Sequence, residues 1–216
     1  MKHWPDIIKC ICATGVVLLS LSSCDSIYDD PSEIPSTVTE FGLYENVDAT
    51  DYKQWVYLNL EDSTQTTLSY DNTADIPSQW HLALHRYDLK TNGGSACQTA
   101  YTSLEDLRTD LENGSFALPA LSEFAADEDG KITIDMSHMM EGWLDYADAQ
   151  LNKVLGTWLD VDTSNMPPNY TMGDKVYLVR MADGTVAAIK FTGYSNPYKS
   201  NTKGYISFTY IYPLDI

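Results

Sequence analysis

Val176-Tyr177-Leu178-Val179-Arg180 and Ala187-Ala188-Ile189-Lys190-Phe191 lie on either side of Ala182-Asp183-Gly184. Both outer segments are rich in β-branched and aromatic residues, which fit the pleated, half-buried surface of a strand. Asp-Gly between two such segments is a common sequence for the tight turn of a β-hairpin. This stretch therefore predicts a hairpin and favours a mostly β fold.

Four further segments have the composition of strands. They are residues 55–60, 80–87, 132–134 and 205–212, and a turn at Asp129-Gly130 is expected before the third of them. Two other segments have apolar residues at helical spacing. The first follows a capping box at Ser103 and can end at Gly114. Their apolar positions are Leu104, Leu107 and Leu111 in the first, and Leu144, Ala147, Leu151 and Val154 in the second. The sequence thus predicts a single, mostly β domain with one or two short helices.

The N-terminus has the pattern of a lipoprotein leader. Lys2 and Lys9 precede an apolar run at residues 11–21, and Leu21-Ser22-Ser23 stands directly before Cys24. A charged segment, a short apolar segment and small residues before the cut indicate secretion, and the run is too short to span a membrane. We predict a signal peptide at residues 1–23 and lipidation of Cys24. The alternative is an ordinary signal peptide with a chance cysteine.

Residues 24–40 form a predicted lipidated, flexible tether, because they are polar, acidic and contain proline. The domain itself is expected at residues 41–216. An acidic stretch directly after a lipidated cysteine also resembles the surface-export signal of Bacteroides-type lipoproteins. Anchoring in the outer membrane, facing the cell exterior, is therefore expected.

Charge and cysteine content exclude two classes of protein. The formal charge of the chain is −18, so binding of nucleic acid through its phosphates is not expected. Four cysteines are present; Cys10 and Cys12 leave with the leader, and Cys24 carries lipid. Only Cys97 remains, as a predicted small buried apolar residue, so no disulfide framework stabilises the domain.

Catalytic motifs are absent from the sequence. It has no Gly-rich phosphate loop, no Gly-x-Ser-x-Gly, no His-Glu-x-x-His and no Cys-x-x-Cys-His for covalent haem. His81 and His85 would share one face of a strand, which suits a metal. Ordinary hydrogen-bond partners are the favoured interpretation, since no acidic residue or cysteine has zinc-site spacing with them. The protein is expected not to be an enzyme.

Methionine is unusually clustered in this chain. Of the 7 methionines, five lie within residues 136–172. Four of these five form two groups: Asp135-Met136-Ser137-His138-Met139-Met140 and Asn165-Met166-Pro167-Pro168. In one turn of helix, residues 136, 139 and 140 share a face. Prolines after Met166 favour an extended, stiff loop that presents its thioether. Thioethers fill gaps in cores, and they also ligate soft metals and haem iron, so both interpretations stay open.

Several motifs occur in a fixed order along residues 41–216. They are Asp48-Ala49, Tyr52-x-x-Trp55-x-Tyr57, Trp80-x-x-Ala83-Leu84-His85-Arg86-Tyr87-Asp88, Trp158-Leu159-Asp160, Val179-Arg180-x-Ala182-Asp183-Gly184, Phe191-Thr192-x-Tyr194 and Phe208-Thr209-Tyr210-x-Tyr212-Pro213. The Ala-Leu-His-Arg-Tyr-Asp run and the Tyr-Pro ending are the more specific ones. By these motifs the chain resembles the HmuY-like family, haem-binding surface lipoproteins of Bacteroides-type bacteria.

The resemblance implies a mostly β domain that holds haem between finger-like loops. In the founding members, two histidines from separate loops ligate the iron. Here the loop after residues 158–160 has no histidine and offers Thr163, Asn165 and Met166, which fits the branch that uses methionine. The axial ligands that we carry over are Met139 and Met166, with Met136, Met140 and His138 as alternatives to the first and Met172 to the second. Tyr146 and Tyr170 lie close to these loops in sequence and are expected at the propionates.

The function that the resemblance implies is non-covalent, hemophore-like haem binding at the cell surface. Host haemoproteins would be haem donors, and a TonB-dependent outer-membrane receptor would accept the haem. Two other classes stay open: a lipid-anchored glycan- or peptide-binding module whose methionines are core packing, and a hydrolase whose carboxylates cannot be singled out among so many.

Overall fold

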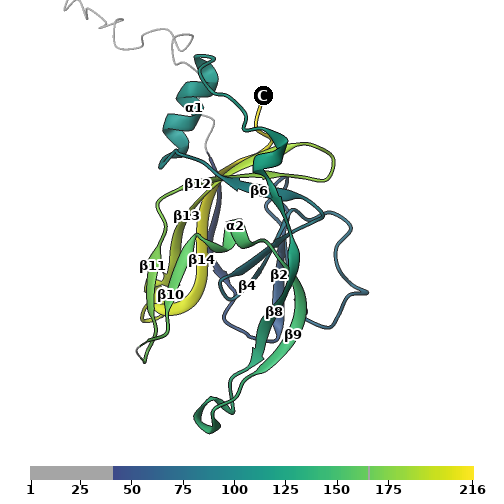
Figure 1. Ribbon diagram of the computed structural model, residues 1–216, viewed down its shortest axis with the longest axis vertical. Coiled ribbons are helices and arrows are strands. Elements are labelled where there is room, and N and C mark those ends of the chain that lie inside the picture. The colour runs from purple at the N-terminus through teal and green to yellow at the C-terminus, as the bar shows by residue number, and fades with distance from the viewer. Residues whose placement is uncertain (1–40, 165) are drawn as a thin grey trace, which may run out of the picture. The chain divides into compact units, whose positions relative to one another are not determined.

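The computed structural model describes residues 41–164 and 166–216, and the predicted leader and tether lie outside them. The described part is mostly β, as predicted (Figure 1). The first sheet has the order β1 (Gly42–Asp48), β14 (Thr202–Ile211), β13 (Val186–Asn196), β12 (Val176–Arg180), β6 (Ser95–Gln98) and β7 (Ala125–Ala126). The second has the order β3 (Gln65–Ser69), β2 (Gln54–Leu58), β4 (Leu82–His85) and β5 (Asp88–Thr91).

Two hairpins stand apart from these sheets, and two short α-helices complete the fold. The hairpins are β8 (Glu128–Asp135) with β9 (Asp145–Leu151), and β10 (Leu159–Asp162) with β11 (Asn169–Met172). The helices are α1 (Leu104–Glu112) and α2 (Lys153–Gly156). Single 3-10 turns lie at Leu121–Glu123, Met139–Glu141 and Pro197–Lys199.

The main core lies between the two sheets. In β2, Val56 and Leu58 face this core, while Trp55 and Tyr57 belong to a second cluster on the outer face of the same sheet. The β8–β9 hairpin covers that outer face through residues such as Ile132. A strand that is buried on both faces has no polar alternation, so it appears in the sequence as an unbroken apolar run.

The first sheet is buried on both faces in the same way. Tyr177 and Val179 of β12 face the main core, whereas Val176 and Leu178 pack under α1 with Leu107. The predicted hairpin is confirmed, since β12 pairs with β13 and Gly184 takes a left-handed φ of 92° in the turn. The predicted helix at residues 104–111 is confirmed as well, because the side chain of Ser103 accepts from the backbone N–H groups of Glu105 and Asp106.

Two local predictions were wrong. The segment with Leu144, Ala147 and Leu151 at helical spacing is the strand β9, and only Lys153–Gly156 is helical there. Ala147, Ala149 and Leu151 also alternate, and this face packs against the outer cluster of the second sheet. The Asp129-Gly130 turn is instead part of β8, where a Cβ on Gly130 would lie 2.8 Å from the Leu151 side chain.

Lys90 on β5 is enclosed by aromatic rings on the outer face of the second sheet. Its Nζ lies 4.2 Å from the ring centre of Trp55 and 5.0 Å from that of Tyr57, and it donates to the Tyr57 hydroxyl at 3.3 Å. Burial lowers the pKa of Lys90 to about 8, against the opposing charge of Asp127. In the unfolded chain the amine keeps its ordinary pKa near 10.4.

Lys90 is expected to make the protein more stable as pH rises from about 8 to about 10, because the unfolded state binds more protons than the folded state in that window. Lys90→Met keeps most of the alkyl packing and removes this gain. Urea unfolding of both proteins at the two ends of the window measures it. Tyr44 and Tyr194, whose pKa values burial raises, contribute equally to both proteins. Equal pH slopes for the two proteins would contradict the expectation.

Candidate functional site

The two separate hairpins extend from the same side of the domain (Figure 1). In the β8–β9 hairpin, the carboxylate of Asp135 accepts the N–H of Ser137 at 2.7 Å and starts the turn. The 3-10 turn Met139–Glu141 follows, and Gly142 ends it with a left-handed φ of 91°. Residues 136–140 are thus held in a compact turn at the hairpin end.

The methionines of this turn differ in exposure. Met140 is 90% exposed and Met139 is 36% exposed, while Met136 is half-buried. The ring of His138 stacks on Trp143, with centroids 3.9 Å apart and 10° between the planes. Its Nδ1 also lies 3.2 Å from a carboxylate oxygen of Glu141. His138 is therefore occupied by contacts within its own turn, whereas the thioethers of Met139 and Met140 face solvent.

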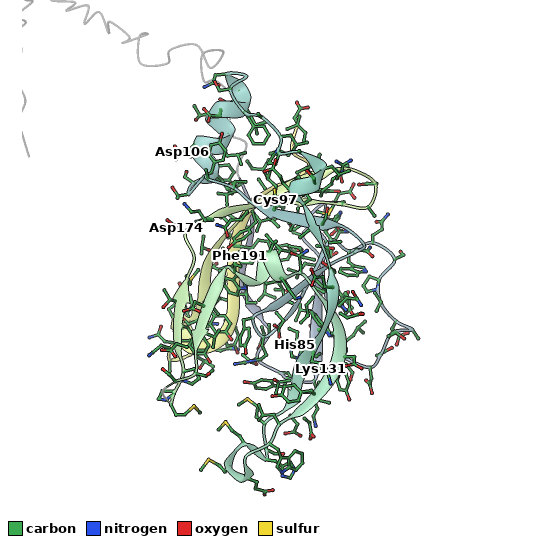
Figure 2. All side chains as sticks on the ribbon, in the orientation of Figure 1. His85, Cys97, Asp106, Lys131, Asp174 and Phe191 are labelled. Atoms are coloured by element: carbon green, nitrogen blue, oxygen red, sulfur yellow. The ribbon has the colours of Figure 1, made fainter. Side chains whose placement is uncertain are left out.

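The β10–β11 hairpin carries the second methionine group. Its strands pair from Leu159 with Met172 to Asp162 with Asn169, and residues 163–168 connect them. Met166 is 65% exposed in this connection, whereas Met172 is half-buried and packs against the main core. Asn165 lies outside the described residues. Figure 2 shows yellow sulfur atoms at the ends of both hairpins.

The turn that joins β4 to β5, residues 85–88, is linked through residues 52 and 53 to the end of β8, where the turn of the β8–β9 hairpin begins. His85 Nε2 lies 2.8 Å from the carbonyl oxygen of Tyr52. The next residue, Lys53, forms a 3.3 Å ion pair with Asp135 at the end of β8. Figure 2 shows the labelled His85 on the side of the domain from which the hairpins extend.

The same turn contacts the β10–β11 hairpin through aromatic residues. The indole N–H of Trp158, directly before β10, donates to the carbonyl oxygen of Tyr87 at 3.0 Å. The ring of Tyr194 on β13 lies 5.7 Å from that of Trp158, 5.1 Å from that of Tyr170 and 6.4 Å from that of Tyr87. These four residues form an aromatic cluster at the base of the β10–β11 hairpin.

Arg86 is the cation of this turn. Its side chain is buried, its Nη1 donates to the carbonyl oxygen of Thr50 at 2.9 Å, and its guanidinium lies 4.5 Å from the ring centre of Tyr52. Burial raises the pKa of Tyr194, and the charge of Arg86 opposes that shift, which places the two side chains in one electrostatic environment. Neither Arg86 nor Tyr194 was predicted as a site residue from the sequence. The position of an arginine within an apolar segment predicted to be a strand could have pointed to Arg86.

The two tyrosines expected at the ligand lie differently. Tyr170 belongs to the aromatic cluster, whereas Tyr146 lies on β9 opposite Thr133 and is 54% exposed. A groove of about 590 Å³ also adjoins the β10–β11 hairpin, with Tyr170, Met172 and Tyr194 among its lining residues. Met139 and Met166 do not line it.

His81 has ordinary partners, as predicted, whereas His85 has one only at Nε2; its buried Nδ1 makes no hydrogen bond and lies 3.6 Å from a carboxylate oxygen of Asp88. His81 Nδ1 accepts the N–H of Leu60 at 3.0 Å, and its Nε2 lies 3.0 Å from the Tyr212 hydroxyl. Within residues 41–164 and 166–216, no three His, Cys, Asp or Glu side chains are placed to hold a metal ion. Cys97 is buried, and burial raises its pKa to about 11, so it is a packing residue and not a reactive thiol.

The model of the HmuY protein family matches residues 51–210 of this chain. The chain belongs to the HmuY family. Its match covers both hairpins and strands of both sheets, though not β1, and includes Met139, Met166 and the 85–88 turn. No curated protein sequence matches the chain.

Three solved structures are similar to this HmuY-family chain. One, from Bacteroides vulgatus and designated HmuY-like and heme-binding, is 38% identical, with a TM-score of 0.72 over 88% of this chain and 98% of that one. A lipoprotein structure from Bacteroides fragilis is 44% identical, with a TM-score of 0.72 over 83% and 95%. The apo HmuY analog of Tannerella forsythia is 28% identical, with a TM-score of 0.62 over 78% and 95%.

Proposed function

We propose that this protein binds haem non-covalently between the ends of the β8–β9 and β10–β11 hairpins, with Met139 and Met166 as axial ligands. The observation that carries the proposal is the exposure of thioethers on two hairpins that extend from one side of an HmuY-family domain. Met side chains at such positions contribute little to the core. Thioether sulfur is a soft, neutral donor that suits haem iron.

The surroundings of Met172, His138 and Met136 make each of them a poorer ligand than the proposed pair. Met172 packs against the main core, so Met166 is the available thioether of its hairpin. On the other hairpin, His138 is stacked on Trp143 and contacts Glu141. Met136 is half-buried, and Met140 is the most exposed of the group. Met140, Met136 and His138 remain the alternatives to Met139.

The aromatic cluster supports the same ligand. A porphyrin is a flat apolar ring, and the half-buried members of the cluster, Tyr87 and Tyr170, offer it aromatic surface, whereas Trp158 and Tyr194 are buried. Tyr170 is half-buried within this cluster, on the hairpin that carries Met166. The competing function, a glycan- or peptide-binding module with methionines as core packing, accounts for Met172 and Met181 but not for the exposed Met139, Met140 and Met166.

A titration of the purified protein with haemin tests the proposal. The expected result is a shifted Soret band that saturates at one haem per chain. An unshifted spectrum would refute it. In the cell, haem taken from host haemoproteins would pass to a TonB-dependent receptor, and the acidic surface keeps such a tethered protein soluble.

Lipidation of Cys24 is expected to hold the protein on the outer membrane, facing the cell exterior. Cys24→Ala removes the acceptor of the acyl chains, so most of the protein should move to the soluble fraction and incorporate no labelled fatty acid. Ser23→Ala, which keeps a small residue before the cut, is the matched control and should stay with the membranes. Labelled fatty acid on Cys24→Ala would rule out this anchor. Among the described residues, no helix is long and apolar enough to cross a membrane.

A further inference from the structure

Arg86 is a buried cation without an anion. Arg86 is only 9% exposed, yet no described carboxylate lies within ion-pairing distance of its guanidinium. The Nε–H has no hydrogen-bond partner either. Burial of an unpaired charge is costly, so buried arginines are normally paired with a carboxylate or phosphate. In a chain of formal charge −18, an unpaired buried cation is the more unusual.

The backbone at Arg86 is also held in an uncommon conformation. Its φ is 55°, in the left-handed region that residues with a side chain rarely adopt outside functional or tightly constrained turns. Gly204 on β14 makes room for the guanidinium, because a Cβ there would lie 2.6 Å from Arg86 Nη1. The fold therefore keeps the guanidinium inside despite the free-energy cost of burying its charge. An arginine with an exposed side chain would not have this cost.

Another unpartnered polar group lies on the residue whose ring is 6.4 Å from that of Tyr87, the neighbour of Arg86 in the turn. The hydroxyl of Tyr194 is buried and makes no hydrogen bond. Buried hydroxyls are almost always bonded, since an unmade hydrogen bond costs about 1–3 kcal/mol. A phenol O–H and a guanidinium N–H both donate hydrogen bonds, and a carboxylate has two oxygens that accept them. The two groups together are therefore suited to bind a carboxylate.

Half-buried aromatic side chains cover both groups. Tyr52 lies over the guanidinium, and Tyr170 packs against Tyr194. Tyr170 belongs to the β10–β11 hairpin, and Lys53, next to Tyr52, is paired with Asp135 of the β8–β9 hairpin. Access of a ligand group to Arg86 and Tyr194 therefore requires these two tyrosines to move.

We infer that Arg86 and Tyr194 form a carboxylate-binding site, which receives a propionate of the porphyrin held between the hairpins. The inference rests on the proposed function and names the part of the chain that fixes the orientation of the ring. Arg86 supplies the charge and Nε–H, Tyr194 supplies O–H, and Tyr52 and Tyr170 move aside from them. The two methionines then set the position of the iron, while this site sets the rotation of the porphyrin.

Titrations of the wild type and Tyr194→Phe with haem and with haem dimethyl ester test the inference. A hydrogen bond to a charged group corresponds to about a tenfold change in affinity. The wild type is therefore expected to prefer the free acid over the ester by at least about tenfold, and Tyr194→Phe to lose most of this preference. Arg86→Met should lose all of it.

Stability of the unloaded protein gives an independent readout. Tyr194→Phe removes a hydroxyl without a partner, so its free energy of unfolding should stay the same or increase. Tyr177→Phe is the matched control, since the Tyr177 hydroxyl is bonded to Thr157 at 3.0 Å. This control should lose stability and keep the preference for the free acid.

Three results would overturn the inference. Equal affinities of the wild type for acid and ester, with a normal Soret shift, would remove the carboxylate site and leave the proposed haem function intact. An unchanged preference in Tyr194→Phe, or a loss of its stability when unloaded, would show that the hydroxyl serves another partner. A Soret band that shifts with neither porphyrin would refute the proposed function itself.

Discussion

Met166→Ala is expected to change the spectrum of bound haem and to weaken haem binding strongly, while the far-UV circular dichroism stays as in the wild type. Met166 is 65% exposed at the end of a hairpin, so its truncation opens no cavity. A buried methionine would instead cost about 2–5 kcal/mol of stability on truncation. The measurements are a haemin titration and urea unfolding of the same preparation.

Met172→Ala is the matched control for this variant. Met172 lies on the same hairpin but packs against the main core, so its truncation should lower stability and leave the haem spectrum unchanged. The opposite assignment, with unchanged titration and lost stability in Met166→Ala, would exclude Met166 as a ligand. On the other hairpin, Met139→Ala should reproduce the effect of Met166→Ala, and Met140→Ala should not.

The strands that are buried on both faces were predictable, because a short unbroken run of β-branched and aromatic residues indicates a strand without any need for a hydrophobic period. In β2 and β12, every second residue faces the main core and the others face a second cluster, so both strands are continuous apolar runs in the sequence. The segment of β9 was not predictable in this way. Leu144, Ala147 and Leu151 satisfy a helical period, and Ala147, Ala149 and Leu151 satisfy a strand period. Packing against the second sheet decides between them, and a sequence window contains no information on that contact.

In the candidate site, too, the features that are local in sequence were predictable, and those that depend on tertiary packing were not. Clustering of methionines was visible because both groups are local in sequence, and the structure places them at the ends of two hairpins. Arg86 and Tyr194 are 108 positions apart and belong to different sheets, which come together only through tertiary packing. A missing carboxylate partner is a property of the folded surroundings. No sequence pattern reports it.

Ferrous haem is expected to bind more tightly than ferric haem. Two thioethers are neutral and soft, so they do not offset the extra positive charge of the ferric form, and methionine ligation raises the reduction potential of haem. Exposed carboxylates near the hairpin end, such as Asp135 and Glu141, favour the ferric form. Their effect is small, because exposed charges are screened by water and salt and are typically worth about 0–1 kcal/mol.

The thermodynamic cycle that links binding and reduction makes this prediction quantitative. Each tenfold preference for the ferrous form raises the one-electron potential of bound haem by about 59 mV relative to free haem. Haem titrations in air and with dithionite, together with the midpoint potential of the bound haem, give the same quantity by two routes. Equal affinities, or tighter ferric binding, would refute ligation by two methionines. His138 or another harder donor would then have to hold the iron. To do so, the His138 ring would first have to leave its stack on Trp143.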